Sequence, residues 1–172
     1  DNIAGERPLD WGGFVYCVKK LRNKLVAYGE NGVSVLAPVG VVFGLEGVHN
    51  IGLKGKHAIA GTNSEHYFVD VFGNLFSMTE TTKKLGYEEY LSQLNESIVL
   101  TFDTESKLLY ICDGVKGFIY NTSTGSFGEG PENITGIGYK DEVTYVTASS
   151  SITTAPFEIC TDIFDLGSRA GK

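Results

Sequence analysis

Short runs of alternating apolar and polar residues occur along most of the chain, and tight turns separate them. The run FVYCVKK (residues 14–20) is followed by KLVAYG and VSVL, which flank the turn sequence ENG. HYFV and LFSM flank DVFGN in the same way, and LLYIC and FIYN flank DGVKG. Because every second residue of a strand shares one face, these runs predict β-strands, and the Gly and Asn between them predict hairpins.

The three predicted hairpins recur at a regular interval. Asn31, Gly73 and Gly114 mark their turns, at steps of 42 and 41 residues. Another alternating run and a polar turn precede each hairpin, and a short upstream stretch, interpreted as a first strand, begins near residues 9, 48, 91 and 134. On this reading IGLKGKHAIAG (residues 51–61) and IGYKDEVTYVT (residues 137–147) are the same part of repeats two and four.

A four-stranded unit recurring every 40 to 45 residues is typical of a β-propeller blade. We therefore predict an all-β fold, a β-propeller-like repeat of about four four-stranded antiparallel blades, forming either a small propeller or an arc of a larger one. The repeats are predicted over residues 9–38, 48–79, 91–125 and 134–167, within one domain of residues 1–172. A β-sandwich or barrel is the alternative, although neither explains one common period.

Composition narrows the classes of partner. The 172 residues are 42% apolar and 20% charged, which is typical of a soluble globular protein. The net charge of -7, with scattered Lys and Arg, argues against binding to nucleic acid or anionic lipid. No stretch of about 18 apolar residues predicts a membrane span, and no signal peptide is visible, so we expect a virion or cytoplasmic location.

Residues suited to catalysis or metal binding are few. The only histidines are His49, His57 and His66, and no nucleophile elbow, CxxC pair or phosphate-binding loop accompanies them. His57 and His66 begin neighbouring predicted strands, and Asp70 follows on the same face as His66, which makes these three the candidate metal ligands. Because lone histidines at strand ends are usually solvated or capped, we predict no metal, no cofactor and no enzymatic activity. The three widely spaced cysteines are expected to be buried free thiols.

Aromatic residues provide the other candidate site. Residues 79–94, TETTKKLGYEEYLSQL, are the only stretch with loosely helical spacing, and they lie between predicted repeats two and three. Trp11, Tyr87 and Tyr90 could act as stacking surfaces for a carbohydrate or a peptide. The simpler interpretation assigns most aromatic residues to the core.

The C-terminal segment IFDLGSRAGK (residues 163–172), together with the blade pattern, resembles the propeller-containing structural proteins of tailed bacteriophages, in the head-completion and tail group. The resemblance implies a non-catalytic structural role in the virion, within a homo-oligomeric ring or a larger assembly of protein subunits. Two other functions remain open. One is a carbohydrate- or peptide-binding β-propeller module, and the other is a metal-dependent propeller hydrolase.

Overall fold

Three consecutive parts of the chain each fold into a four-stranded antiparallel sheet in the computed structural model, which describes residues 8–40, 42–140 and 143–148. The strands of each sheet pair in chain order. The first sheet contains β1 (Val15–Leu21), β2 (Lys24–Gly29), β3 (Val33–Val39) and β4 (Val42–His49). The second contains β5 (Ile59–Gly61), β6 (His66–Val69), β7 (Leu75–Met78) and β8 (Thr82–Gly86). The third contains β9 (Val99–Asp103), β10 (Leu108–Cys112), β11 (Gly117–Asn121) and β12 (Phe127–Glu129).

Two further elements complete the described part of the chain. β13 (Ile134–Lys140) and β14 (Val143–Ala148) form a two-stranded antiparallel sheet. A short helix, α1 (Glu88–Leu91), follows β8. No helix among the described residues has the length and apolar character needed to cross a membrane.

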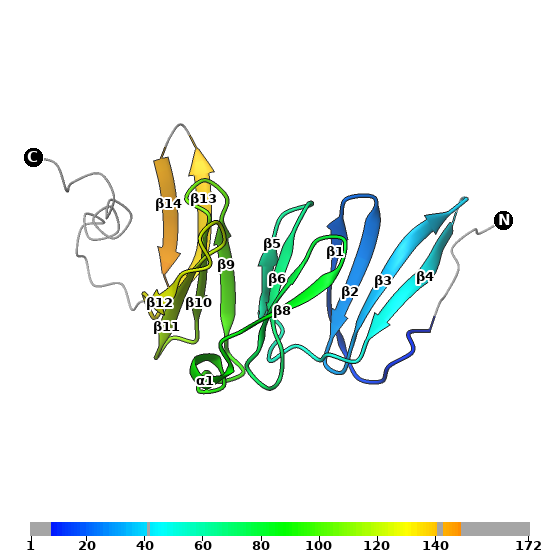
Figure 1. Cartoon of the computed structure of the whole chain (residues 1–172), viewed down its shortest axis with the longest axis horizontal. Coiled ribbons are helices and arrows are strands. Elements are labelled where there is room, and N and C mark those ends of the chain that lie inside the picture. Colours follow the sequence, from blue (N-terminus) through cyan, green and yellow to red (C-terminus); the bar gives the residue numbers. More distant parts are fainter. Residues whose placement is uncertain (1–7, 41, 141–142, 149–172) are drawn as a thin grey trace, which may run out of the picture.

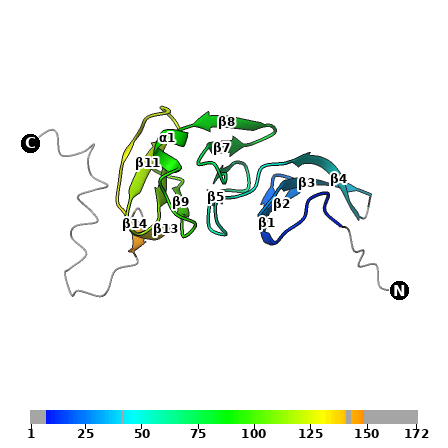
Figure 2. The ribbon, with the colours of Figure 1, turned by 90° about the horizontal axis from the view of Figure 1, so that it is seen from below.

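The sheets stand side by side in chain order, as Figure 1 shows. Seen at right angles, β1, β5, β9 and β13 lie along one side of the row, while β4 and β8 lie toward the other (Figure 2). Corresponding turns of adjacent sheets meet, since the Arg22 amide in the β1–β2 turn donates to the Asn63 carbonyl in the β5–β6 turn at 2.5 Å. The second sheet therefore lies between the first and the third.

The predicted all-β class, the four-stranded antiparallel units and the three hairpins are confirmed. Each of the three four-stranded sheets nevertheless begins and ends later than the predicted repeat, because the stretch predicted as its first strand lies outside it and its fourth strand follows the hairpin. The fourth predicted repeat begins with β13, and its residues 149–167 lie outside the described residues. Residues 9–11 form no strand, and the upstream stretch of the third repeat begins in α1. The two echoed segments also differ in structure, since residues 51–54 precede the first strand of their sheet whereas residues 137–140 lie within β13. The shared sequence pattern therefore does not mark a shared position in the two sheets.

Aspartates organise the hairpin turns. The Asp70 Oδ1 accepts hydrogen bonds from the backbone amides of Phe72 (3.0 Å) and Asn74 (2.7 Å) after β6. The Asp113 Oδ1 accepts from the amides of Val115 (2.9 Å) and Lys116 (2.8 Å) after β10. A carboxylate that binds turn amides in this way replaces the missing ladder bonds. These acidic residues therefore stabilise the turns.

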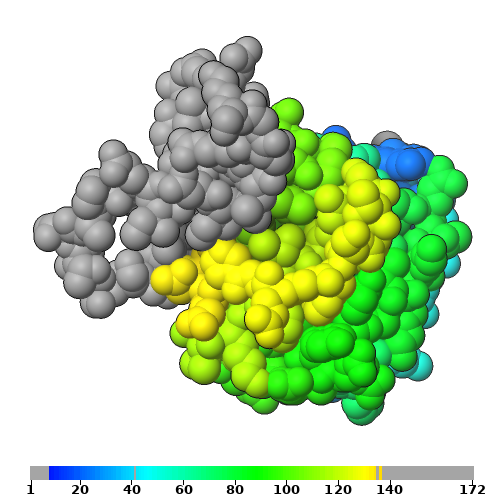
Figure 3. Space-filling view, turned by 60° about the vertical axis from the view of Figure 1, so that its left-hand side comes forward, coloured from blue at the N-terminus to red at the C-terminus, as the bar shows by residue number. Residues whose placement is uncertain are grey.

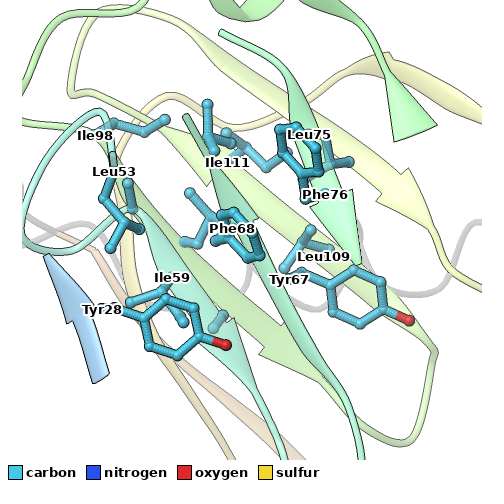
Figure 4. Packing of buried hydrophobic residues seen from close by; sticks show 14 of the residues in the cluster. Tyr28, Leu53, Ile59, Tyr67, Phe68, Leu75, Phe76, Ile98, Leu109 and Ile111 are labelled. Carbon is cyan, nitrogen blue, oxygen red and sulfur yellow. The ribbon is translucent and has the colours of Figure 1, made fainter. Parts of the chain in front are cut away.

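The core lies in the seams between sheets. Alternate residues of β6 face opposite neighbours, so that Phe68 contacts Tyr28 of the first sheet at a ring distance of 5.5 Å, while Tyr67 contacts Phe102 of the third at 5.3 Å. Figure 4 shows the Phe68 ring at the centre of this cluster, beside Phe76, on which it stacks at 5.2 Å and 9°. A strand buried on both faces reads as a nearly continuous apolar run, which is why β6 and β10 are so apolar.

Candidate functional site

A groove lined with aromatic residues opens where the second and third sheets meet, beside α1. It has a volume of about 410 Å³, and we call it the aromatic groove. The yellow surface around β12 borders the green surface that contains α1 in the space-filling view (Figure 3). A second hollow of about 400 Å³, which includes Gln93 and Lys116, continues from it past Tyr90. The aromatic groove is lined by Tyr87, Glu89, Tyr90, Phe118, Phe127, Gly128 and Glu129.

The backbone around α1 holds the first wall of the aromatic groove. The chain leaves β8 at Gly86 (φ 103°) and turns at Tyr87 (φ 67°), two successive residues in conformations that L side chains rarely adopt. Leu91 at the end of α1 is fully buried and fixes the helix on the core. Gly73 in the β6–β7 turn lies directly beneath, because a Cβ at that position would lie 2.3 Å from the Ser92 amide nitrogen. Tyr87 and Tyr90 are therefore presented by an anchored segment.

The aromatic rings form a layered wall. The Tyr87 ring stacks on Phe127 at 4.2 Å and 11°, and Phe127 stacks on Phe118 at 5.4 Å and 21°. Tyr90 crosses this column at an angle, 5.4 Å from Phe127 and 6.0 Å from Phe118. Tyr90 is 43% exposed, whereas Phe118 is buried. The Tyr87 hydroxyl donates to the Gly125 carbonyl at 2.9 Å, so that ring is held on both sides of the seam.

The charge of the aromatic groove is negative. Glu89 on α1 and Glu129 on β12 are exposed, and both line it. Neither carboxylate makes a hydrogen bond or an ion pair with another described residue, whereas neighbouring Glu88 faces Lys84 at 4.0 Å. The Lys116 Nζ, in the adjoining hollow, donates to the Gln93 Oε1 at 2.5 Å. Two free carboxylates thus flank a wall of stacked rings.

Trp11, the third predicted stacking residue, lies elsewhere. Its ring packs against the β2–β3 hairpin, where Gly29 and Gly32 leave room for it. Its Nε1 donates to the Ser34 Oγ at 2.8 Å. Trp11 therefore covers the first sheet, and the structure brings together only Tyr87 and Tyr90 of the three predicted residues.

His66 has a structural role in the seam between the first and second sheets. Its side chain is 1% exposed, and its Nε2 lies 3.0 Å from the Lys20 carbonyl oxygen. Because a carbonyl only accepts, Nε2 carries the proton, and Nδ1 accepts from the Tyr28 hydroxyl at 2.8 Å. Burial lowers the pKa of His66 to about 4, with a smaller opposing contribution from the Lys20 carbonyl. The imidazole is therefore neutral, and both of its nitrogens are occupied.

The predicted metal ligands do not converge. His66 begins β6 and Asp70 follows its last residue, so four residues of extended chain, about 13 Å, separate two groups on one face. Asp70 is buried and holds its turn, while His57 is exposed before β5. Among the described residues no three His, Cys, Asp or Glu side chains form a group that could hold a metal ion.

The cysteines within the described residues are free. Cys112 is 2% exposed, and its Sγ donates to the Ile134 carbonyl at 2.8 Å. Burial raises the pKa of the Cys112 thiol to about 11. Cys17 is half-buried, and burial also raises its pKa. Cys112 is therefore the buried free thiol that the sequence predicted, whereas Cys17 is free but only partly buried. Cys160 lies outside the described residues.

Three side chains of the aromatic groove, those of Phe118, Phe127 and Glu129, could not be recognised from the sequence. Phe118 and Phe127 come from β11 and β12, and their runs read as ordinary strands. Glu89 and Glu129 are 40 positions apart and carry no shared motif. The only available signal was that residues 79–94 interrupt the repeat, which located one wall but not the other.

Comparison with known proteins places the chain in no family. No protein-family model matches it, and no curated protein matches it either. A solved structure of PorZ, described as an essential bacterial surface component of the type-IX secretion system of Porphyromonas gingivalis, is similar at 15% identity with a TM-score of 0.44. The match covers 80% of this chain and 19% of the PorZ chain, so the chain spans about a fifth of that protein's length.

Proposed function

We propose that the protein is a non-catalytic structural and assembly protein whose sheets are blades of a β-propeller or of an arc of one. The observation that carries this proposal is a contact between the segment that leads into β5 of the second sheet and β9, the first strand of the third. His57, just before β5, forms a parallel bridge to Val99 at the start of β9, and its carbonyl accepts from the Leu100 amide at 3.0 Å. Adjacent parallel inner strands are expected where blades surround a common axis.

The outer face of the first sheet supports an assembly role. Because Tyr28 and Val26 face the second sheet, the strand register directs Val18 and Phe43 to the opposite face. Val18 is 56% exposed and Phe43 is 45% exposed. In the second and third sheets the faces that meet at the seam are buried. We propose that the outer face of the first sheet packs against a further sheet, as expected in a stacked repeat array.

The virion role is the specific form of this proposal. It rests on the resemblance of residues 163–172 to bacteriophage head-completion and tail proteins, and that segment lies outside the described residues. Acidic surface and repeated sheets suit a subunit of a protein ring, since closed symmetry uses one interface repeatedly.

Light scattering on the full gene product tests the assembly role. A discrete oligomer is expected, and Phe43→Glu or Val18→Glu should reduce its mass by placing a charge on the outer face. Val115→Glu is the matched control, because Val115 is 67% exposed in the β10–β11 turn, away from that face. A monomeric wild-type protein, or equal dissociation by the control variant, would refute the assembly role.

A second function is supported by the aromatic groove. Stacked rings flanked by free carboxylates could bind a carbohydrate or a peptide. Spectral shifts confined to groove residues on addition of a ligand would support this function. Ligand titrations that leave the groove unperturbed would contradict it.

A further inference from the structure

We infer that the aromatic groove binds an extended basic segment of a partner protein, with a lysine or arginine side chain lying against Tyr90 and Phe127 between Glu89 and Glu129. This inference rests on the second proposed function and names its ligand. It assigns a chemical role to the two carboxylates, which the fold itself does not use.

The rings favour a cation. Cations bind over the faces of Tyr and Phe within about 6 Å of the ring centre, because the ring face is electronegative. Tyr90 is tilted by 41° from Phe127 and by 61° from Phe118, so the wall presents ring surfaces in more than one direction. Its 43% exposure leaves the Tyr90 ring accessible from solvent. A flat guanidinium could lie on such a surface, and an ammonium could sit above it.

The carboxylates beside the rings favour a positively charged ligand. Glu89 and Glu129 come from opposite sides of the seam, and neither is paired with a described Lys or Arg. Glu132 adds a third exposed carboxylate in the adjoining hollow, where Lys116 is the opposing charge. A basic ligand neutralises this excess, whereas an anionic or neutral ligand leaves it uncompensated. The complementary charge therefore favours a basic peptide over a neutral glycan.

The surrounding backbone favours an extended segment. β12 is the edge strand of the third sheet and β8 is the edge strand of the second. Edge strands carry main-chain groups that an added strand can pair with. Gly128 in the middle of β12 has open space where a Cβ would project, so a partner backbone can approach it closely. Side-chain capture in the groove and main-chain pairing at β12 can occur together.

The test uses amide NMR spectra of the full chain, titrated with two short peptides. One is a Gly/Ser peptide carrying arginine, and the other replaces each arginine with citrulline, which has nearly the same shape without the charge. We expect the arginine peptide to shift the amides of Tyr90, Gly128 and Glu129, and the citrulline peptide to bind at least about tenfold more weakly. Raising the salt concentration should weaken the arginine peptide further, since exposed charge pairs are screened.

Two exposed positions allow variants that should not disturb folding. Glu129→Gln removes one carboxylate, and Tyr90→Ala removes one ring, and each should weaken arginine-peptide binding about tenfold. Tyr90→Phe keeps the ring and should keep binding. Glu105→Gln is the matched control, because Glu105 is exposed in the β9–β10 turn, outside the groove, and it should have no effect.

The outcomes separate this inference from the function on which it rests. Equal binding of the arginine and citrulline peptides would overturn the role of the cation. Groove shifts with a neutral oligosaccharide but with neither peptide would overturn the inference and preserve the binding function. The absence of groove shifts with every ligand would overturn both.

Discussion

Acidification should destabilise this protein through a single buried imidazole. His66 is neutral in the fold, with Nε2 donating to Lys20 and Nδ1 accepting from Tyr28. Its pKa is about 4 when folded, against 6.5 for an unperturbed histidine, so the unfolded chain binds a proton that the folded chain excludes over this interval. Stability from this group is therefore complete above pH 6.5 and is lost as the pH falls toward 4.

The magnitude follows from the shift in pKa. Each pKa unit corresponds to about 1.4 kcal/mol of stability. The free energy of unfolding therefore falls by about 3 kcal/mol by pH 4, and by about 2 kcal/mol between pH 7 and pH 5. A proton on Nδ1 would also face the hydrogen of the Tyr28 hydroxyl. That hydroxyl would then have to turn its hydrogen toward the Met78 Sδ, which lies 3.4 Å from the hydroxyl oxygen. A domain with ordinary marginal stability would lose a large fraction of its free energy of unfolding.

Urea denaturation at pH 7, 6 and 5 measures this effect. Wild type should lose about 2 kcal/mol more than His66→Gln over that range, because glutamine keeps polarity at the site without titrating. Other acidic and basic groups contribute equally to both proteins and cancel in the difference. The matched control is His57→Gln, which makes the same substitution at an exposed histidine outside this seam. If wild type and His66→Gln lose stability in parallel, the assignment of His66 as a buried neutral imidazole is wrong.

Three further predictions concern packing and reactivity. Gly73 and Gly114 share a φ of 89°, but of the two only Gly73 has backbone atoms where a Cβ would lie. Gly73→Ala should therefore lower the melting temperature more than Gly114→Ala. Equal decreases in melting temperature would contradict the close approach of Gly73 to α1. Leu109→Ala should cost about 2–5 kcal/mol in chemical denaturation because the side chain is fully buried, and a loss below about 1 kcal/mol would contradict the seam. Cys112 should react with iodoacetamide at pH 8 about a hundredfold more slowly in the native protein than in urea, because its thiol is buried and has a raised pKa. Peptide mass spectrometry measures the two rates, and comparable rates would contradict this burial.

The hairpins were the part of the fold that could be predicted from the sequence. The alternation in residues 66–69 and 75–78, with DVFGN between them, specified a hairpin because strand period and turn chemistry depend on neighbouring residues. The position of the fourth strand in each sheet was harder. β12 is three residues long and contains Gly128, and its pairing with β11 decides that it is a strand. Short edge strands carry too few residues for a clear periodic signal.

The candidate site, like the fold, was only partly predictable from the sequence. Tyr87 and Tyr90 were found because they lie within one unusual segment, whereas Phe118, Phe127 and Glu129 joined them only when the third sheet packed against the second. His66 and Asp70 shared a predicted face, and the sequence could not tell that one would be buried against Tyr28 and the other would hold a turn. Trp11 looked like a ligand platform until its contact with the β2–β3 hairpin was visible.

The sequence by itself determined the hairpins, the strands that flank their turns and their regular recurrence, since these depend on residues close together in the chain. Only the tertiary structure decided which faces became seams, which rings met beside α1 and which carboxylates were left free. Those outcomes depend on contacts between residues far apart in sequence, such as Tyr87 with Phe127, and no local pattern encodes them. The physical reason is that a sheet buries its faces only against another sheet, so the identity of each partner is settled when the sheets pack.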